Sequence, residues 1–179
     1  MEPDYKELSR ICANVERAIS IIPQKAAVIA VNFSKERFVK KNWLDTTETP
    51  WKKTKKRKGS TLIKSGRLKR SIRKVHIGAD YVIIGTDVPY ARIHNDGGTI
   101  EGTEQVRSHQ RRAHKRKAYT RSNKRIKAGI VRAHTVKAYK RKFKRTFIQR
   151  KFIGQSQHLT DQLTNMIQTE IQKAIRISK

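Results

Sequence analysis

Apolar residues recur at helical spacing over the first forty positions of the chain. The first stripe consists of Leu8, Ile11, Cys12, Val15, Ala18, Ile19 and Ile22. This spacing predicts an amphipathic helix, and Asp4 can cap its amino-terminal end. A second apolar stretch continues to Lys41, and Pro23 either separates two helices or kinks one. Both stripes are expected to pack in a core, with contact to a neighbouring subunit as the alternative for one of them.

The clearest amphipathic pattern lies at the carboxyl-terminal end of the chain. Its apolar positions are Leu159, Leu163, Met166, Ile167, Ile171, Ala174 and Ile175. Ser156 is a suitable N-cap, and Arg176 suits the negative end of the helix dipole. We expect this helix to pack across a sheet together with the amino-terminal helix.

Between the two helical regions, residues 64–101 show the patterns of short strands. Residues 71–77 alternate, with Val75 and Ile77 on one face, which predicts a strand with one exposed face. Residues 81–86 hold a continuous apolar run, which predicts a strand buried on both faces. Gly78 lies in the short linker between these strands, which predicts a hairpin because glycine adopts positive φ without strain.

The same region contains short motifs in a fixed order. They are Ser65-Gly66-Arg67-Leu68 with Ser71-Ile72, Ile83-Ile84-Gly85-Thr86, and Tyr90-Ala91-Arg92-Ile93-His94 with Gly97-Gly98. Two outlying pieces are Trp51-Lys52 and Arg150-Lys151-Phe152-Ile153-Gly154. In this order the pieces resemble the phage virion morphogenesis (tail completion) family, which is similar to head–tail joining and tail terminator proteins of tailed phages. The resemblance covers about residues 1–102 and 147–179, and residues 103–146 depart from it.

We assign a structural role to the residues that carry the motifs. They are Gly66, Leu68, Gly85, Tyr90, His94, Gly97, Gly98 and Gly154. Tyr90, Ile93 and His94 are expected on a short turn or helical segment that packs against the sheet. Asn95, Gly97 and Gly98 permit a tight reversal, which His94 is expected to anchor by hydrogen bonds.

His94, Asn95 and Asp96 could instead suggest a nuclease or metal site. A nuclease of the HNH type needs a second metal-binding histidine on a following helix, and Gly97-Gly98-Thr99 follows here. Paired carboxylates are also missing, because Asp80, Asp87, Asp96 and Glu101 lie on separate turns. We therefore expect no catalytic residue, no metal site and no cofactor.

The chain carries a large excess of basic residues. The 179 residues include 43 Lys and Arg against 14 Asp and Glu, a formal net charge of +29, and 36% hydrophobic residues. Such a charge predicts a polyanionic partner, either DNA, RNA or an acidic protein surface. Cys12 is the only cysteine, which excludes an intramolecular disulfide, and it is expected in the core. The start of the chain lacks a signal-peptide pattern and residues 26–31, the longest apolar run, are too short to span a bilayer, so we expect no membrane partner.

Two segments concentrate the basic residues. Residues 42–64 are predicted to form an irregular basic loop, and residues 103–149 a basic arm inserted between two strands. Residues 103–151 contain 19 Lys or Arg and one acidic residue, Glu104. The candidate contacts to DNA or to an acidic partner are Lys52, Lys53, Lys55, Lys56, Arg57, Lys58, Arg111, Arg112, Lys115, Arg116, Lys117, Lys124, Arg125, Lys140, Arg141, Lys142, Lys144 and Arg145.

The arm is expected to run outward over residues 99–107 and to return over residues 138–149, with helical tips near residues 109–117. Evenly spread cations favour sequence-independent contact with a phosphate backbone or with an acidic protein surface. A disordered loop that orders on its partner is the alternative. No internal repeat is visible that would decide which partner the arm binds.

Taken together, the patterns predict an α+β fold in a single tail-completion-like domain over residues 1–179. Its antiparallel sheet of about four strands is covered by the amino- and carboxyl-terminal helices and carries the long basic hairpin. The resemblance implies a structural virion protein, not an enzyme, at the neck or the top of the tail, assembled in the host cytoplasm. It implies a homo-oligomeric ring, expected with six or twelve copies, and portal, adaptor or tail proteins as partners, with genomic DNA as a further candidate. A sequence-independent nucleic-acid-binding protein is the main alternative, and a phage nuclease is a third function that the scarce acidic residues oppose.

Overall fold

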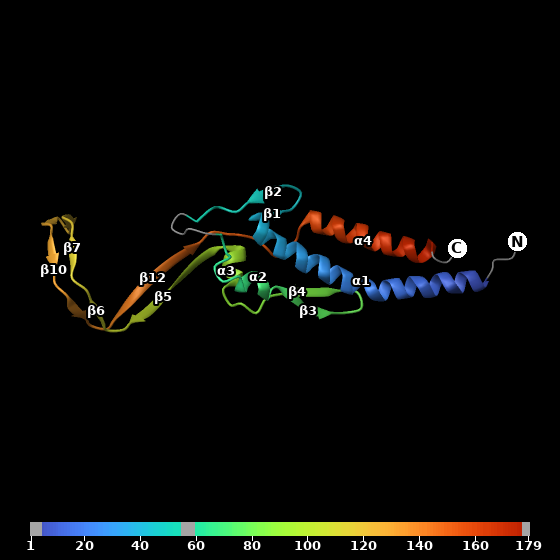
Figure 1. Ribbon diagram of the computed structural model, residues 1–179, viewed down its shortest axis with the longest axis horizontal. Coiled ribbons are helices and arrows are strands. Elements are labelled where there is room, and N and C mark those ends of the chain that lie inside the picture. The colour runs from blue at the N-terminus through green and yellow to red at the C-terminus, as the bar shows by residue number, and fades with distance from the viewer. Residues whose placement is uncertain (1–4, 55–59, 177–179) are drawn as a thin grey trace. The chain divides into compact units, whose positions relative to one another are not determined.

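The computed structural model describes residues 5–54 and 60–176 of the chain (Figure 1). It divides into two compact units, which are described separately below. We call the first unit, Met1–Gly98 with Phe147–Lys179, the body. We call the second unit, Thr99–Thr146, the arm.

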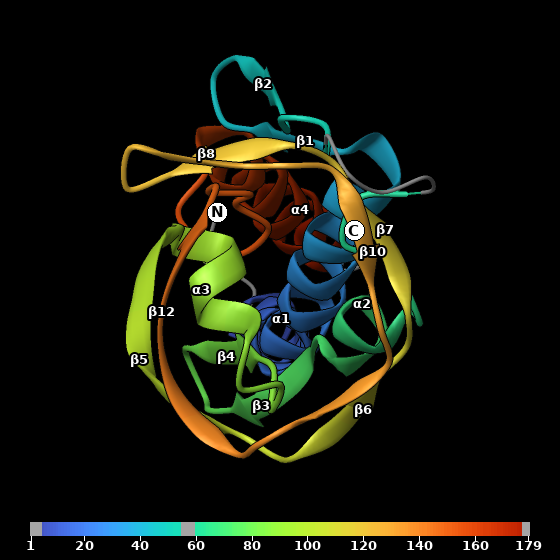
Figure 2. The same cartoon turned by 90° about the vertical axis from the view of Figure 1, so that its left-hand side faces the viewer.

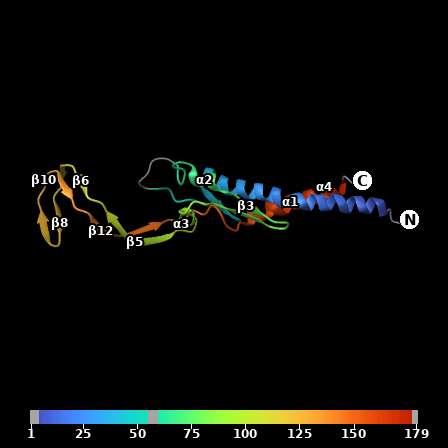
Figure 3. The ribbon, with the colours of Figure 1, turned by 90° about the horizontal axis from the view of Figure 1, so that it is seen from below.

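Two helices form the long elements of the body. Helix α1 (Tyr5–Lys40) continues through Pro23, which is buried, so both amino-terminal apolar stripes lie on one helix. Helix α4 (Gln157–Arg176) runs beside α1 (Figures 1 and 3), and the Lys25 ammonium lies 2.6 Å from the Glu170 carboxylate between them. The Ser156 hydroxyl accepts a hydrogen bond from the Leu159 amide at 3.2 Å, which confirms the predicted N-cap.

Cys12 is exposed, so its predicted place in the core is wrong. The reason is the length of α1. A helix of 36 residues is about 54 Å long, whereas the 20 residues of α4 span about 30 Å. The buried residues of α1 begin only at Pro23, so the core lies at the carboxyl-terminal end of this helix.

Short elements fill the remainder of the body. The hairpin of β1 (Asn42–Leu44) and β2 (Glu48–Pro50) forms where the sequence suggested irregular structure. Helix α2 (Arg67–Ser71) precedes the antiparallel hairpin of β3 (Arg73–Ile77) and β4 (Val82–Gly85), and helix α3 (Ala91–Asp96) follows it. The hairpin is thus confirmed, and the Gly78 amide donates to the Tyr81 carbonyl at 2.9 Å, but Gly78 does not adopt the positive φ that was expected of it.

The sheet differs from the prediction. Helices at both ends of the chain are confirmed, but the strands form antiparallel pairs instead of one four-stranded sheet. The chain leaves β4, turns through α3, and enters a strand that pairs only with its own returning partner. As a result β4 is not buried on both faces, and 48% of Ile83 is exposed.

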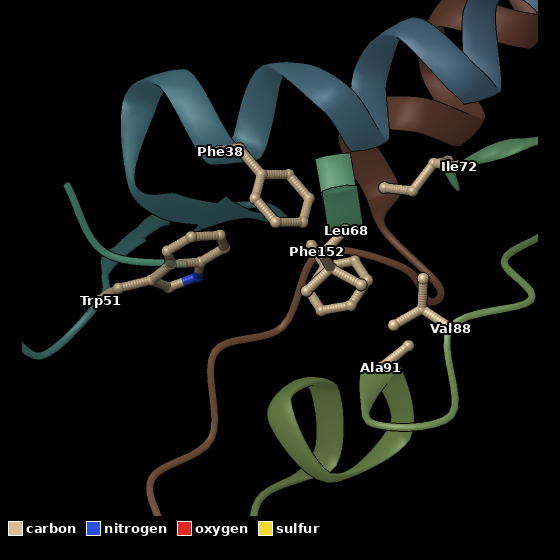
Figure 4. Close-up of a cluster of buried hydrophobic side chains, with 7 residues drawn as sticks. All are labelled: Phe38, Trp51, Leu68, Ile72, Val88, Ala91 and Phe152. Atoms are coloured by element: carbon tan, nitrogen blue, oxygen red, sulfur yellow. The ribbon is translucent and has the colours of Figure 1, made fainter. Parts of the chain in front are cut away.

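The core of the body joins residues that lie far apart in the sequence (Figure 4). It consists of Phe38, Trp51, Leu68, Ile72, Val88, Ala91 and Phe152. The Phe38 ring meets the Trp51 ring edge-on with centroids 5.5 Å apart, and the Phe152 ring at 4.9 Å. Five of the seven residues belong to the ordered motifs of the sequence, so the motifs are where this core is built.

The arm is one long antiparallel hairpin. Its outward strands are β5 (Gly98–Val106), β6 (His109–Arg111), β7 (His114–Arg116) and β8 (Tyr119–Arg121). Its returning strands are β9 (Lys124–Ile126), β10 (Gly129–Val131), β11 (His134–Val136) and β12 (Tyr139–Phe147). The expected outward and returning strands correspond to β5 and β12, whereas the helical tips predicted near residues 109–117 are strands instead.

A two-residue turn closes the tip of the arm. Ser122 and Asn123 both have positive φ, 47° and 61°, between β8 and β9. Positive φ at both central residues is the geometry whose twist matches that of the flanking strands in a short hairpin. Asparagine tolerates this conformation better than most residues, which explains its place at the tip.

Candidate functional site

The motif residues meet at a junction in the body, next to the point where the arm leaves. Gly66 has a φ of 71° at the start of α2, and Leu68, two residues later, is buried in the core. The Ser71 hydroxyl lies 2.6 Å from the Thr86 hydroxyl, which joins the end of α2 to the chain after β4. A Cβ at Gly85 would lie 3.2 Å from Val75, so this glycine lets the two strands approach.

Asn95 connects α3 to the segment that precedes α4. Its Oδ1 accepts hydrogen bonds from the amides of Phe152 and Ile153 at 2.9 and 3.0 Å. Gly97 follows with a φ of 74°, and a Cβ there would lie 2.9 Å from the Gln149 amide nitrogen. This is the tight reversal that the sequence suggested at these residues.

The His94 ring is held by aromatic packing. It lies edge-on to Tyr90 and Phe147, with ring centroids 5.9 and 5.5 Å away. Its Nδ1 is buried without a hydrogen-bond partner in the described part of the chain, so this nitrogen does not make the hydrogen bonds expected of His94. The backbone supplies the anchor, because the Arg150 amide donates to the His94 carbonyl at 2.8 Å. Burial, and after it the charge of Arg150, lowers the pKa of His94.

Two long-range hydrogen bonds close the junction from the side of β2. The Trp51 indole N–H donates to the Lys151 carbonyl at 3.0 Å. The Arg150 guanidinium donates to the Lys52 carbonyl at 2.9 and 3.2 Å, and its burial lowers the pKa of this arginine. The outlying motif pieces therefore contact each other directly. These contacts hold Trp51 and Lys52 against the segment that precedes α4.

An apolar groove of about 570 Å³ lies open on the body, between α1, α4 and the β3–β4 hairpin. Its walls include Ile22 and Ala30 of α1 together with Leu163 and Ile167 of α4. The stripe of α4, predicted as core, is only half-buried along Leu159, Leu163 and Ile167. One copy of the chain thus leaves this apolar surface uncovered.

The distal arm contains a repeat of five residues, so the conclusion from the sequence that no internal repeat is visible is wrong. Each unit reads basic, small, then mostly His or Tyr, any residue, then Arg or Val. The units are residues 107–111, 112–116 and 117–121 on the outward strand and 127–131, 132–136 and 137–141 on the returning strand. The first two residues of a unit interrupt the strand, and the last three form it.

The repeat keeps one register along the hairpin. The pairs Tyr119 with Ile126, His114 with Val131 and His109 with Val136 each place a ring opposite a β-branched residue. Such cross-strand pairs stabilise antiparallel ribbons. Because the interruptions on the two strands lie opposite each other, the ribbon changes direction at these points (Figure 2).

Three of the ring residues make the same local contact. The Nδ1 atoms of His109, His114 and His134 lie 3.1, 3.3 and 2.9 Å from the carbonyl oxygen two residues earlier, which belongs in each case to the basic first residue of the unit. We call the two-residue interruptions between the short strands breaks. In the breaks at residues 107–108, 112–113 and 132–133, this contact holds the backbone beside the basic side chain.

A sequence profile of the phage virion morphogenesis family matches residues 41–172. The chain belongs to the phage virion morphogenesis family. Comparison with curated proteins and with solved structures finds no match. The matched range includes the junction, the whole arm and α4 as far as Gln172, whereas the motif resemblance alone did not extend through residues 103–146.

As a member of the phage virion morphogenesis family, this protein has a role in the structure or assembly of a bacteriophage virion. The family is a structural and assembly family and is not known for enzymatic activity. Within residues 5–54 and 60–176, no three His, Cys, Asp or Glu side chains gather where they could hold a metal ion. Over the same ranges, no helix combines the length and apolar content that crossing a membrane requires.

The structure distributes the candidate contact residues of this virion protein in three ways. Lys52 and Lys53 are exposed on the body, and Lys55, Lys56, Arg57 and Lys58 lie outside the described residues. At the base of the arm, Arg141 and Arg145 pair with Glu104, and Lys144 pairs with Glu101. The hydrogen bond from Arg141 lowers the pKa of Glu104. The other candidates on the arm are exposed and form no ion pair within the described part of the chain: Arg111, Arg112, Lys115, Arg116, Lys117, Lys124, Arg125, Lys140 and Lys142.

Sequence reasoning missed five basic residues of the arm. These are Arg107, Arg121, Lys127, Arg132 and Lys137, all exposed. Four of them occupy the first position of a five-residue unit. Their signal was the repeat itself, which is visible once residues 107–141 are aligned in steps of five.

Proposed function

We propose that this family member is a structural protein that completes the phage tail or forms the connector ring of the neck, and that six or twelve copies close into a ring. The observation that carries this proposal is the apolar groove on the body. A ring needs a surface on each subunit and a different, complementary surface on its neighbour. The groove supplies one such surface.

The amino-terminal part of α1 supplies the second surface. Leu8 is 49% exposed and Tyr5 75% exposed, on the stretch of helix that is too long for α4 to cover. An apolar helix stripe and an apolar groove that are both uncovered on one copy can cover each other between two copies. We therefore assign the groove to the amino-terminal half of α1 from a neighbouring subunit.

The ring would join portal, adaptor or tail proteins, with the arm in contact with DNA or with acidic neighbouring proteins. The net charge of +29 and the basic arm also support a second candidate, a sequence-independent nucleic-acid-binding protein. This candidate gives no role to the apolar groove. The ring accounts for both the groove and the charge.

Substitution of one groove residue tests the ring. Ile167→Asp places a charge in the groove, where a docked apolar helix could not solvate it, and should convert the oligomer into a folded monomer. Asn165→Asp adds the same charge to an exposed position of α4 and should leave the oligomer intact. Sedimentation velocity with circular dichroism measures both properties. An Ile167→Asp protein that assembles like the wild type would refute the proposed use of the groove.

A further inference from the structure

The breaks in the arm place basic residues in pairs. Arg111 opposite His134 and His114 opposite Val131 flank one break, so Arg112 on one strand and Arg132 on the other lie in the same break. By the same register, Lys117 and Lys127 share the next break toward the tip. Arg107 and Lys137 occupy the third break, between the β5–β12 pair and the β6–β11 pair.

This placement is unfavourable for the isolated chain. Like charges directly opposite each other across a hairpin destabilise it, and Arg121 lies directly opposite Lys124 at the tip. In the breaks the two cations are one position apart: the register of the flanking strands sets Arg112 opposite Ala133 and Arg132 opposite Ala113. Residues 105–146 contain no Asp or Glu to offset them. The two acidic residues of the arm, Glu101 and Glu104, pair with cations at its base. A feature that breaks a local rule of stability in this regular way points to a bound polyanion.

We infer that the arm is a phosphate-binding ribbon, in which each break presents a pair of cations to the backbone of duplex DNA. The inference deepens the proposed function by naming the partner of the arm. The proposed phosphate-binding residues are three cation pairs, which we call the ladder: Arg107 with Lys137, Arg112 with Arg132, and Lys117 with Lys127. The strands between the breaks act as spacers of constant length.

Three observations favour DNA over an acidic protein. First, the cation pairs recur at a constant interval, which suits a partner whose negative charge also repeats along its length. Protein interfaces instead depend on a few central apolar anchors. Second, the apolar members of the repeat, Ile126, Val131 and Val136, are half-buried in cross-strand pairs within the ribbon. Third, the major groove of B-DNA admits a two-stranded β-ribbon.

The spacing also predicts how the cation pairs act together. Five residues of extended strand span roughly 17 Å, about twice the Debye length at physiological ionic strength, which is about 8 Å. Neighbouring breaks are therefore largely screened from each other. Each should bind phosphates locally, and their contributions to the salt dependence of binding should add.

The test uses the full-length protein and a fluorescent duplex of about 30 base pairs with random sequence, with binding measured by anisotropy at several salt concentrations. The break variant carries Arg112→Gln, Lys117→Gln, Lys127→Gln and Arg132→Gln. Its logarithmic salt slope should fall in magnitude by roughly three to four, since each phosphate contact contributes about 0.9. Its affinity at about 0.1 M salt should fall by roughly three orders of magnitude, because the change in slope acts over the decade of salt concentration below about 1 M. All four residues are exposed and lie outside the strands, so the fold should persist.

Two controls separate the ladder from bulk charge. The helix variant loses the same charge at exposed helix positions of the body outside the amino-terminal half of α1, through Lys40→Gln, Arg67→Gln, Lys173→Gln and Arg176→Gln, and should keep the wild-type slope to within about one unit. The swap variant exchanges Lys117 with Thr120 and Arg132 with Ile130, which conserves charge and composition but moves one cation of each pair from its break onto a strand. Because each of these breaks then holds a single cation, it should bind roughly tenfold more weakly.

Several outcomes would overturn the inference. Equal losses in the break and helix variants, or a swap variant that binds like the wild type, would mean that bulk charge binds the DNA. Competition by poly-glutamate as strong as by unlabelled duplex would make an acidic protein the partner. Sedimentation of the same samples tests the ring separately from DNA binding. A break variant that forms rings but binds no DNA would leave the proposed ring intact. A wild-type protein that binds DNA as a monomer would contradict the ring but not the inference about the arm.

Discussion

Single residues at the junction occupy conformations and environments that few other side chains would accept. Gly97 needs both a positive φ and close contact with the backbone of Gln149. His94 buries a polar nitrogen without a partner among the described residues. Both residues belong to the motif Tyr90-Ala91-Arg92-Ile93-His94 with Gly97-Gly98. A substitution at each position can test its contribution to the stability of the body.

Gly97→Ala should destabilise the body. The new Cβ would lie 2.9 Å from the Gln149 amide nitrogen, and the φ of 74° is strained for alanine. We expect a loss of about 1–3 kcal/mol in the free energy of unfolding, measured by urea denaturation. Gly129→Ala is the matched control, because a Cβ there meets no atom within 4 Å, and it should leave the stability of the body unchanged.

His94 should make the stability of the body depend on pH. Burial, and secondarily Arg150, lowers the pKa of His94 in the folded state, so the unfolded state binds more protons as pH falls below the ordinary histidine value of about 6.5. Stability should therefore be full above about pH 7 and fall as the pH drops through about 6.5. Urea denaturation at about pH 7.5 and 5.5 measures this difference.

Two substitutions check the assignment to His94. His94→Phe preserves the edge-on contacts with Tyr90 and Phe147 and should reduce the pH dependence. His109→Phe removes a histidine of the arm and should leave the pH dependence of body unfolding as it is. An undiminished dependence in the His94→Phe protein would assign the effect to another group.

At the scale of elements, predictability follows the range of the interactions that form each element. The stripes that end at Ile22 and Ile175 predict α1 and α4, because helical hydrogen bonds and apolar spacing are local. The N-cap at Ser156 and the hairpin at Gly78 are also local signals and are confirmed. The predicted four-stranded sheet fails because strand pairing is non-local: the register of β5 depends on residues some forty positions later.

The sequence of the arm contains a repeat from which its strands were not predicted. The five-residue repeat is visible in the sequence, yet period five matches neither the helical period nor the strand period. Only the structure shows that two residues of each unit form the break and three form the strand. The same holds for α1, where spacing alone did not show that the helix continues through Pro23 or that Cys12 is exposed.

The arm can be removed without touching the core. Replacing Thr99–Thr146 with Asn-Gly, a favoured two-residue hairpin turn, keeps every residue of the core and the junction. The shortened protein should melt within about 3 °C of the wild type and should lose the salt-dependent binding of duplex DNA. Differential scanning calorimetry and anisotropy measure the two properties.

The boundary of that deletion matters. Arg150 and Lys151 hold the junction through hydrogen bonds with Lys52 and Trp51, so a deletion that extends to Lys151 should unfold the body and provides a control. A shortened protein that fails to fold with the boundary at Thr146 would show that the body depends on the arm.

At the scale of the whole molecule, two surfaces have separate proposed partners. The groove between α1 and α4 is assigned to a neighbouring copy, and the cation ladder of the arm to duplex DNA. The ordered motifs in the sequence anticipated the family, because they lie at the junction and in the core, where side-chain identity is strictly limited. The sequence could not place the groove, because an apolar stripe on a helix reads the same whether it faces its own core or a neighbouring subunit.

We propose that this chain is a structural component of the virion that closes into a ring at the neck or the end of the tail. Quantitative mass spectrometry of purified phage particles tests it directly, with the copy number of this chain compared with that of the portal protein. We expect a low and fixed number of copies of this chain per particle, about half or equal to that of the portal, as for a closed ring on the tail axis. Absence of the chain from mature particles, or a copy number that varies between preparations, would contradict it.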